Sequence, residues 1–196
     1  MKFLYFAANI LIGKNRYLSV MKTKAEYRKE VRKRKAAYTT DDLAVRSARI
    51  WEQLEALPEF RAARVIAAYW SLPDEVQTQA FIERWCREKT VLLPVMCEGN
   101  RLELKPYTPG CRMNEAAFCI SEPEGEPFLP ERVDLILVPG VAFDRSCNRL
   151  GRGKGYYDRL LRDMCAYRVG VCFDFQLFDK IPADDHDIPM DIVLHG

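Results

Sequence analysis

The stretch that decides the fold is DLILVPGVAFDRSCNRLGRGKGYYDRLL, residues 134–161. It opens on an unbroken apolar run, residues 135–138, which is typical of a strand buried on both faces. A polar loop follows, and a helix is expected to begin near Gly155. A buried strand that leads through a loop into a helix is the repeating unit of parallel sheets. This stretch therefore predicts an α/β protein.

The rest of the chain repeats the alternation of strand and helix. A dense basic helix begins at Lys22, and a second helix begins near Thr40 and ends at Pro58. Apolar and polar residues alternate over 101–107, which predicts a hairpin partner for the strand before it. The connection at 108–131 is rich in proline and glycine, so we expect it to be long and irregular. Further strands are expected at 64–70, 90–96, 167–173 and 190–196, and a further helix at 79–89.

These elements predict one α/β domain with three layers, in which helices flank a mostly parallel central sheet on both sides. We expect the domain to occupy residues 21–196 and residues 1–20 to form an amino-terminal extension outside the fold. The apolar stretch from Phe3 to Gly13 is too short to cross a bilayer, so no membrane contact is expected. Ligands of such sheets bind beyond the carboxyl ends of the strands.

The composition is that of an ordinary globular protein. Hydrophobic residues make up 48% of the 196 residues and charged residues 30%, which excludes collagen-like and largely disordered classes. The chain has 30 Lys and Arg residues and 28 Asp and Glu residues, which gives a net charge of +2. This balance argues against a protein that binds nucleic acid over its whole surface. The seven cysteines include no C-x-x-C pair, which argues against zinc and disulfides and favours the reducing cytoplasm.

The loop at 149–155 is the best candidate for an anion site. Gly151, Gly153 and Gly155 alternate with Arg152 and Lys154 just before a helix. Glycines permit positive φ and close approach of the backbone, and exposed amides beside cations suit phosphate. The spacing is neither a P-loop nor G-x-G-x-x-G, so the residues alone also allow a flexible loop with solvated cations.

Acidic residues that follow this loop in the sequence are candidates for a metal site. Asp158 lies in the first turn of the helix, where it either caps the helix or holds Mg²⁺ beside phosphates. Asp191, directly before the last strand, is a candidate second ligand. Asp184, Asp185 and His186 are interpreted as a solvated acidic loop.

Two further pairs are candidates for ligand contacts. Trp70 and Glu75 follow the first strand. An aromatic ring beside a carboxylate suits a heterocyclic ligand that carries amino groups. The alternative is that Trp70 fills the core and Glu75 begins a helix. Lys24 and Arg28 lie one turn apart on the basic helix. They either reach the phosphate region or form part of a solvated face.

The order of these motifs resembles one family over about residues 21–194. Four motifs follow one another here in the order in which they occur in the 5-formyltetrahydrofolate cyclo-ligases. They are K-x-x-x-R, S-L-P-D-E-V-x-T, L-I-L-V-P-G-V-A-F-D and N-R-L-G-R-G-K-G-Y-Y-D-R. The resemblance implies a single α/β domain and the conversion of 5-formyltetrahydrofolate to 5,10-methenyltetrahydrofolate with ATP and Mg²⁺. It leaves folate contacts from segment 108–131 open.

The resemblance also implies roles for individual residues. Lys154 and Arg152 are implied as catalytic, Asp158 and Asp191 as Mg²⁺ ligands, and Trp70 and Glu75 as substrate contacts together with Arg152, Gly153, Lys154, Gly155 and Tyr156. The implied ATP contacts are Lys24, Arg28, Arg149, Leu150, Gly151, Arg152, Gly153, Lys154, Gly155, Tyr156 and Tyr157.

The implied chemistry is transfer of a phosphoryl group to the formyl oxygen, followed by ring closure on the resulting imidoyl phosphate and release of ADP and phosphate. The expected partners are these small molecules, with no nucleic acid, and the expected state is a cytoplasmic monomer. Two alternatives stay open. One is an inactive sensor that binds ATP and folate; the other is an RNA-binding module that uses the basic helix at 22–35.

Overall fold

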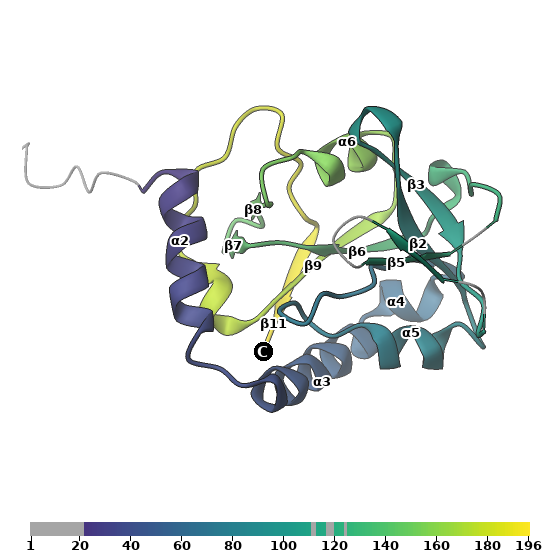
Figure 1. Cartoon of the computed structure of the whole chain (residues 1–196), viewed down its shortest axis with the longest axis horizontal. Helices are drawn as coiled ribbons and strands as arrows, with labels where there is room; N and C mark the ends of the chain where they lie inside the picture. The colour runs from purple at the N-terminus through teal and green to yellow at the C-terminus, as the bar shows by residue number, and fades with distance from the viewer. Residues whose placement is uncertain (1–21, 111–112, 117–119, 124) are drawn as a thin grey trace, which may run out of the picture.

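A six-stranded sheet forms the centre of the molecule, in strand order β11-β9-β6-β1-β2-β3. The computed structural model (Figure 1) describes residues 22–110, 113–116, 120–123 and 125–196. Every neighbouring pair of strands in the sheet is parallel except β2 with β3. The expected extension at 1–20 lies outside the described residues. The strands are β1 (Val65–Ala67), β2 (Thr90–Cys97), β3 (Arg101–Pro106), β6 (Leu135–Pro139), β9 (Tyr167–Cys172) and β11 (Ile192–His195).

Helices cover both faces of this sheet, as the sequence predicts. In Figure 1, three helices lie below the sheet and α6 lies above it, while α2 stands at one side. The helices are α2 (Lys24–Lys35), α3 (Thr40–Ala56), α4 (Pro58–Ala62), α5 (Gln79–Trp85) and α6 (Tyr156–Arg162).

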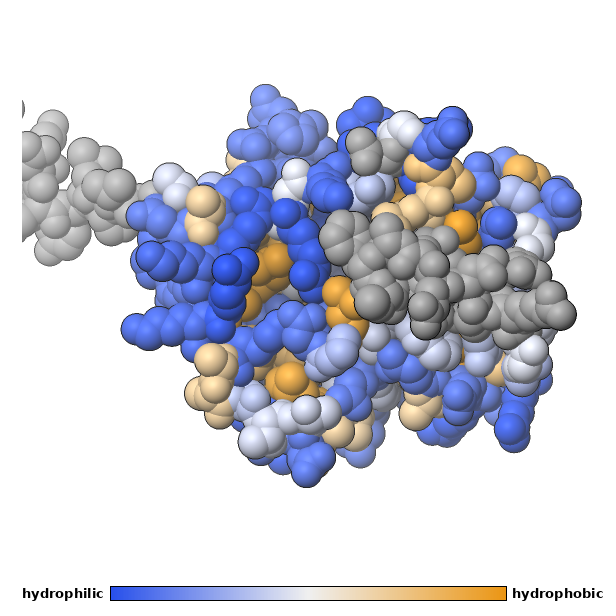
Figure 2. Space-filling model, in the orientation of Figure 1, coloured by the Kyte–Doolittle hydropathy of each residue, from blue (hydrophilic) through white to orange (hydrophobic). Residues whose placement is uncertain are grey.

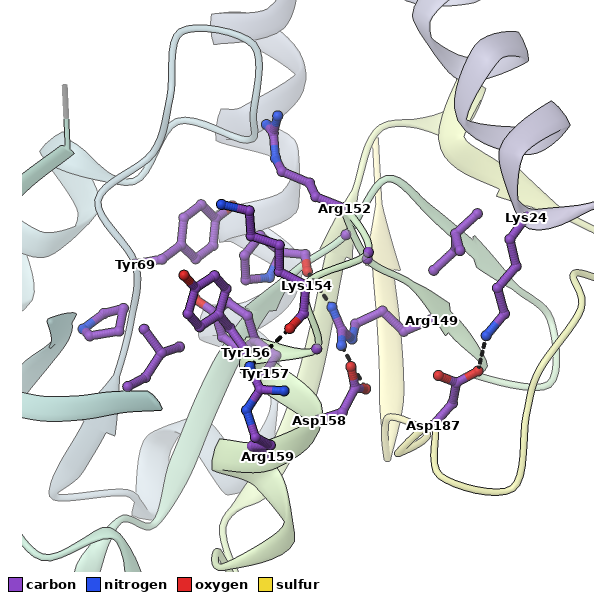
Figure 3. Close-up of a pocket in the computed structure, with 18 of the residues that line it drawn as sticks. Lys24, Tyr69, Arg149, Arg152, Lys154, Tyr156, Tyr157, Asp158, Arg159 and Asp187 are labelled. Atoms are coloured by element: carbon purple, nitrogen blue, oxygen red, sulfur yellow. Dashed lines mark hydrogen bonds and ion pairs between the residues drawn. The ribbon is translucent and has the colours of Figure 1, made fainter. Parts of the chain in front are cut away.

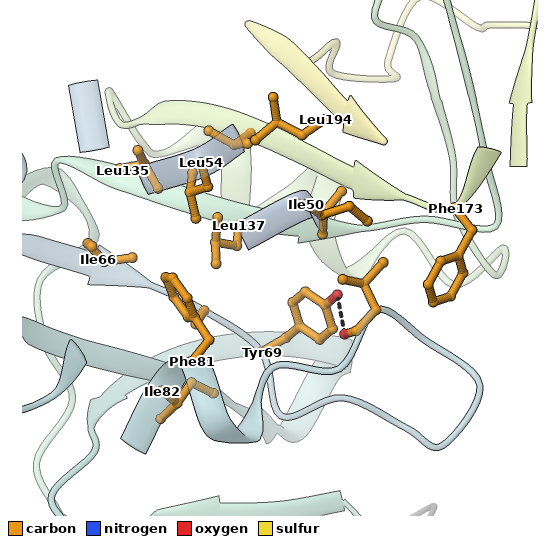
Figure 4. Close-up of a cluster of buried hydrophobic side chains, with 14 of the residues drawn as sticks. Ile50, Leu54, Ile66, Tyr69, Phe81, Ile82, Leu135, Leu137, Phe173 and Leu194 are labelled. Carbon is orange, nitrogen blue, oxygen red and sulfur yellow. Dashed lines mark hydrogen bonds between the residues drawn. The ribbon is translucent and has the colours of Figure 1, made fainter. Parts of the chain in front are cut away.

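The apolar run of β6 explains why the sheet is covered twice. Leu135 and Leu137 face the cluster that contains Ile50 of α3, shown in Figure 4, whereas Ile136 and Val138 belong to the cluster beneath α6. All four β6 side chains are almost fully buried. Successive side chains of a strand point to opposite faces, so a continuous apolar run needs a packed layer on each side.

Local signals in the sequence set the ends of the two amino-terminal helices. Thr23 and Thr39 each form a capping box, in which the threonine side chain accepts from the backbone of the third helical residue and that residue's carboxylate accepts in return. Each pair satisfies two helix-start amides at the surface. On α2, only Tyr27 and Val31 are buried, so the rest of its basic surface stays accessible or pairs with other loops.

Two expectations are corrected by the structure. The segment 108–131, predicted to be irregular, contains a hairpin of β4 (Met113–Ala116) and β5 (Ile120–Pro123). The polar loop after β6 contains the short strands β7 (Ala142–Asp144) and β8 (Arg149–Leu150), which form a second sheet with β10 (Leu177–Phe178). The expected end of the second helix at Pro58 is confirmed, since α3 ends at Ala56, and Pro58 then begins α4 because proline is favoured in a first helical turn.

The surface and the thiols agree with the composition. Hydrophilic side chains cover most of the face drawn in Figure 2, and apolar residues show in small patches between them. The cysteines of the described residues are free thiols, and Cys172 is fully buried in the core. No helix within the described residues has the length and apolarity needed to cross a membrane.

Candidate functional site

A cavity of about 740 Å³ lies at the carboxyl ends of β1 and β6. Trp70 follows β1 and Gly140 follows β6, and both line this cavity with the glycine loop, residues 149–155. α2 forms a further side through Lys24 and Arg28. The cavity therefore lies where ligands of parallel sheets are expected, and it brings together residues from both ends of the chain.

The walls of the cavity differ in chemistry. One side is cationic and carries the glycine loop, and the other is apolar. Tyr69 is buried there; Trp70 packs near Tyr107, with ring centroids 5.8 Å apart. Burial raises the pKa of Tyr69 well above its ordinary value, so this phenol stays neutral. The apolar wall is completed by Leu72, Pro94, Met96 and Leu102.

The glycine loop has the backbone conformation that its sequence predicts. Gly153 (φ +103°) and Gly155 (φ +66°) lie in the left-handed region that favours glycine. Arg28 fixes the loop to α2, because its Nε atom donates to the carbonyl oxygen of Gly151 at 2.9 Å. A Cβ atom on Gly153 would lie 3.4 Å from a guanidinium nitrogen of Arg28. Both glycine geometry and the helix cation therefore hold the loop in place.

Arg149, the first residue of the glycine loop, is buried rather than solvated. Its Nη2 atom donates to Oδ1 of Asp158 at 2.8 Å, and its guanidinium carbon lies 5.6 Å from the ring centroid of Tyr157. The arginine side chain is only 4% exposed, and its buried Nε atom has no hydrogen-bond partner among the described residues. Asp158 is thus held by a buried cation, beside the loop that it was predicted to serve (Figure 3).

A chain of ion pairs joins the glycine loop to the loop that follows β1. Arg152 donates to Oε1 of Glu75 at 2.8 Å and to Oδ1 of Asp74 at 3.4 Å, and Lys35 pairs with Asp74 from the end of α2. Burial raises the pKa of Asp74, but the hydrogen bond from Lys35 and the charge of Arg152 outweigh it and hold that pKa below its ordinary value. Two sequence-predicted residues, Glu75 and Arg152, therefore meet directly.

Buried hydroxyl groups fix the loop that carries Glu75. Thr78 donates to the carbonyl oxygen of Tyr69 and accepts from the amide of Ser71. Ser71 in turn accepts from the amide of Thr78, and Glu75 accepts from the amide of Leu72 at 3.1 Å. Since these bonds close the loop on itself, the carboxylate of Glu75 is presented from a rigid support.

An acidic corner lies beside Lys24. Its ammonium group pairs with Asp184 at 2.7 Å and with Asp187 at 2.6 Å. Burial raises the pKa of Asp187, but the hydrogen bond from Lys24 outweighs it and lowers that pKa below its ordinary value. Asp184, Asp185 and His186 are exposed, in line with the predicted solvated loop, yet Asp184 and His186 also line the cavity with Asp187.

The structure does not bring Asp191 to the cavity. Its carboxylate pairs with Arg168 at 2.7 Å, and its amide donates to the carbonyl oxygen of Arg168. Both residues lie at the amino-terminal ends of β9 and β11, whereas the cavity lies at the opposite, carboxyl edge of the parallel strands. The carboxylates that the 180–191 segment does place in the cavity, paired with Lys24 of α2, are those of Asp184 and Asp187. Asp187 is one of the four aspartates of this segment, and the sequence reasoning did not select it.

The carboxylates of the cavity suit a hard divalent cation. Mg²⁺ prefers one or two carboxylates together with phosphate oxygens, and Asp158 and Asp187 both line the cavity next to the glycine loop. In addition, one ligand atom each from Asp184, His186 and Asp187 lie within 4.8 Å of one another. Carboxylate donors of the kind that Mg²⁺ prefers are therefore present in the cavity, among them Asp158 and Asp187.

Sequence reasoning also missed most of the apolar wall. Tyr69, Pro94, Met96 and Leu102 line the cavity, yet as apolar residues in or near predicted strands they look like core. The other predicted contacts lie together: Lys24, Arg28, Trp70, Glu75, Arg149, Leu150, Gly151, Arg152, Gly153, Lys154, Gly155, Tyr156, Tyr157 and Asp158 all line the same cavity.

Comparisons with known proteins agree with the resemblance seen in the motifs. The family model described as the 5-formyltetrahydrofolate cyclo-ligase family matches residues 20–196. The chain is 32% identical over 180 residues to the 5-formyltetrahydrofolate cyclo-ligase of Haemophilus influenzae, covering 87% of this chain and 96% of that one.

The NMR structure of 5,10-methenyltetrahydrofolate synthetase from Aquifex aeolicus superposes with a TM-score of 0.79 at 40% identity, over 88% of this chain and 89% of that one. The Mycoplasma pneumoniae synthetase shares the fold, with a TM-score of 0.72 at 23% identity over 88% of this chain and 98% of that one. On the family match, which takes in the whole cavity, the chain belongs to the 5-formyltetrahydrofolate cyclo-ligase family, a family of ligases of folate metabolism.

Proposed function

We propose that this protein converts 5-formyltetrahydrofolate to 5,10-methenyltetrahydrofolate with ATP and Mg²⁺. The observation that carries the proposal is that one cavity combines a cationic glycine loop with an apolar wall, and that Arg152 and Glu75 join the two. The names of the relatives support this reaction, and the two unlike walls fit its two unlike substrates.

ATP is assigned to the cationic side. The backbone of the glycine loop is open to close approach, and Lys24, Arg28, Arg152 and Lys154 surround it with positive charge. Nucleotide phosphates are the most highly charged part of either substrate, so they favour this side. The charge of α2 that faces the loop, from Lys24 and Arg28, contributes here, and this supports a role for the helix in the ATP site.

The folate is assigned to the apolar side. A flat pteridine ring stacks favourably on aromatic groups, and Trp70, which packs against the buried Tyr107, lines this side of the cavity with Met96. The N–H groups of the pteridine need acceptors, and Glu75 supplies a carboxylate from a rigid loop. Arg152 hydrogen-bonds Glu75, so the carboxylate assigned to the pteridine lies directly beside a cation of the glycine loop assigned to ATP.

The proposed reaction needs positioning and charge stabilisation more than a nucleophile from the protein. The formyl oxygen attacks the γ-phosphorus, and the bond to ADP breaks, leaving an imidoyl phosphate on N5. N10 then attacks the formyl carbon and loses its proton, and phosphate departs as the ring closes. Lys154 and Arg152 offset the charge that builds on the transferring phosphoryl group.

Bound Mg²⁺ supplies charge neutralisation and orientation of the β- and γ-phosphates. Asp158 and Asp187 are the groups that would hold it, because both line the cavity beside the loop. Arg149 holds Asp158 in place through an ion pair, and Lys24 does the same for Asp187. In this proposal Asp191 has no part in the metal site.

The experiment is product formation by the purified full chain. The near-ultraviolet absorbance of the methenyl product is followed with both ATP and Mg²⁺ and with each omitted, and ADP and phosphate are quantified. Product with both only, in equal amounts with ADP, supports the proposal. Binding of both ligands without product contradicts it and identifies a sensor; product without ATP also contradicts it.

A further inference from the structure

Lys24 pairs with two carboxylates that line the cavity. Its Nζ atom lies 2.7 Å from Oδ2 of Asp184 and 2.6 Å from Oδ2 of Asp187, and Figure 3 shows the ammonium group pointing at Asp187. The side chains of Lys24 and Asp187 are only 24% and 16% exposed, so this contact is partly shielded from solvent. The proposed function assigns Lys24 to the phosphates of ATP and Asp187 to Mg²⁺. The structure nevertheless pairs the two with each other.

The segment that carries these aspartates is anchored at both ends. The amide of Ile181 donates to Oδ2 of Asp144 at 3.0 Å, and Asp144 is fully buried in β7. At the other end, the amide of Met190 donates to the carbonyl oxygen of Cys147 at 2.9 Å. Because the backbone is held on either side, we expect the carboxylate of Asp187 to keep its place when its ammonium partner leaves.

Lys24 is the member of the pair that can move. It is the first residue of α2, and the helix is tied to the start of the same segment, because the hydroxyl of Tyr27 donates to the carbonyl oxygen of Lys180 at 2.7 Å. A lysine ammonium is a point charge on a flexible stem of four carbons, so it can exchange partners without movement of its helix. One turn along α2, Arg28 contacts the glycine loop. Lys24 therefore borders both the acidic segment and the side of the cavity assigned to ATP.

An ammonium group and a divalent cation compete for the carboxylate of Asp187. Both are positively charged, so they repel each other when they are close together. The phosphates of a nucleotide offer the ammonium another partner, because phosphate oxygens accept charge-assisted hydrogen bonds. A move of Lys24 from Asp187 to a phosphate oxygen would thus release the carboxylate when the nucleotide arrives.

We propose that Lys24 acts as a stand-in cation at Asp187 and so makes metal binding depend on bound nucleotide. The inference rests on the proposed function, which assigns Asp187 to the metal. Before ATP binds, Lys24 neutralises Asp187 and weakens the binding of free Mg²⁺. After ATP binds, Lys24 pairs with phosphate and Asp187 is available. Nucleotide and metal then raise each other's affinity by the same factor, as linkage requires.

The test measures metal binding to the full chain in the absence of nucleotide and folate. Mn²⁺ takes the same kind of oxygen ligands as Mg²⁺, and electron paramagnetic resonance follows its free concentration. Wild type is compared with Lys24→Met. The matched control is Arg28→Met, which removes an equal charge from the same cavity, but from a side chain that donates to Gly151 instead of a carboxylate. The double variant Lys24→Met, Asp187→Asn tests whether the ion binds at this carboxylate.

Lys24→Met is expected to lower the Kd of Mn²⁺ about tenfold, a size typical of coupling between two ligands. Arg28→Met is expected to lower it about twofold or less, because it removes only a general positive charge. The double variant is expected to lose the gain. The inference is overturned if Lys24→Met gives no gain, if Arg28→Met gives the same gain, or if the gain survives Asp187→Asn.

Lys24→Gln gives the same comparison if circular dichroism shows that Lys24→Met does not fold. Failure of the proposed function is a separate result, because it is seen as an absence of methenyl product in the activity assay. The Mn²⁺ titrations contain no substrate, so their dissociation constants decide the role of Lys24 whichever way that assay ends.

Discussion

Arg152 donates a hydrogen bond of 2.8 Å to Glu75 and so joins the glycine loop to the loop that follows β1. The two loops carry the groups assigned to different substrates, and Asp74 and Lys35 extend the link to α2. In the proposed function, the pair places a cation for phosphate next to an acceptor for the pteridine, so the sides of the cavity assigned to the two substrates adjoin at this contact.

Glu75→Gln is expected to raise the folate KM about tenfold or more and to change the ATP KM much less. The substitution keeps the shape of the side chain but removes the charge of a hydrogen-bond acceptor, and hydrogen bonds to charged groups contribute about 1.5–3 kcal/mol. Steady-state kinetics with each substrate varied in turn measures this. A larger effect on the ATP KM would show that Glu75 serves the nucleotide instead.

Lys154→Ala is expected to lower kcat about a hundredfold to a thousandfold, the loss typical of removing one group that stabilises transition-state charge. Lys33→Ala, an exposed lysine on α2 that does not line the cavity, is the control. Circular dichroism and urea unfolding confirm that both variants keep the fold. Full activity of a folded Lys154→Ala variant would remove this lysine from the mechanism.

Asp187→Asn is expected to raise the Mg²⁺ concentration that gives half-maximal rate at least about tenfold, since even the loss of groups that orient metal ligands has effects of this size. Asp191→Asn is expected to leave that concentration unchanged, because Arg168 holds Asp191 at the opposite edge of the sheet. Magnesium titrations of the two variants separate the candidates. The reverse pattern would restore Asp191 as the ligand.

Asp191→Asn is instead expected to lower the free energy of unfolding by about 1 kcal/mol at neutral pH, a value for a partly exposed ion pair. The hydrogen bond from Arg168 lowers the pKa of Asp191 below its ordinary value of 3.8, despite an opposing effect of burial. A lowered pKa stabilises the fold above pH 3.8, and the gain is lost as the pH falls through the folded-state pKa. Urea unfolding at several pH values should show the difference between the proteins disappear in acid.

Gly153→Ala is expected to destabilise the protein by about 1–2 kcal/mol and to raise the ATP KM. The residue has φ +103°, which strains an alanine, while its new Cβ atom would lie at an ordinary contact distance of 3.4 Å from Arg28, so the strain falls on the backbone of the loop. Urea unfolding and ATP kinetics measure the two effects. Gly99→Ala is an instructive control, because it also has positive φ but open space around it.

Much of the fold could be predicted because the strands are apolar throughout. Residues 135–138 need cover on both faces, and this requirement alone predicts a parallel sheet between helices. The glycine loop could also be predicted, since alternating glycines and cations before a helix have few other uses. The short strands β7 and β8 could not, because two or three residues carry no readable period.

The choice between Asp187 and Asp191 shows the limit of sequence patterns for the site. The two aspartates lie four residues apart in one segment, mostly without regular structure, so no periodicity tells which one faces the cavity. Lys24, distant in sequence, decides it by pairing with Asp187, while Arg168 draws Asp191 to the other edge. Likewise, the sequence predicts that Met96 and Leu102 are core residues, and only the structure shows that both line the cavity.

The most direct test of the central claim follows the formyl oxygen. 5-Formyltetrahydrofolate labelled with a heavy oxygen isotope in its formyl group is converted with ATP and Mg²⁺ by the full chain, and the released phosphate is analysed by mass spectrometry. If the formyl oxygen attacks the γ-phosphorus in this cavity, the phosphate carries the label in equal amount to the methenyl product. Unlabelled phosphate, with the label released to water, would contradict the account.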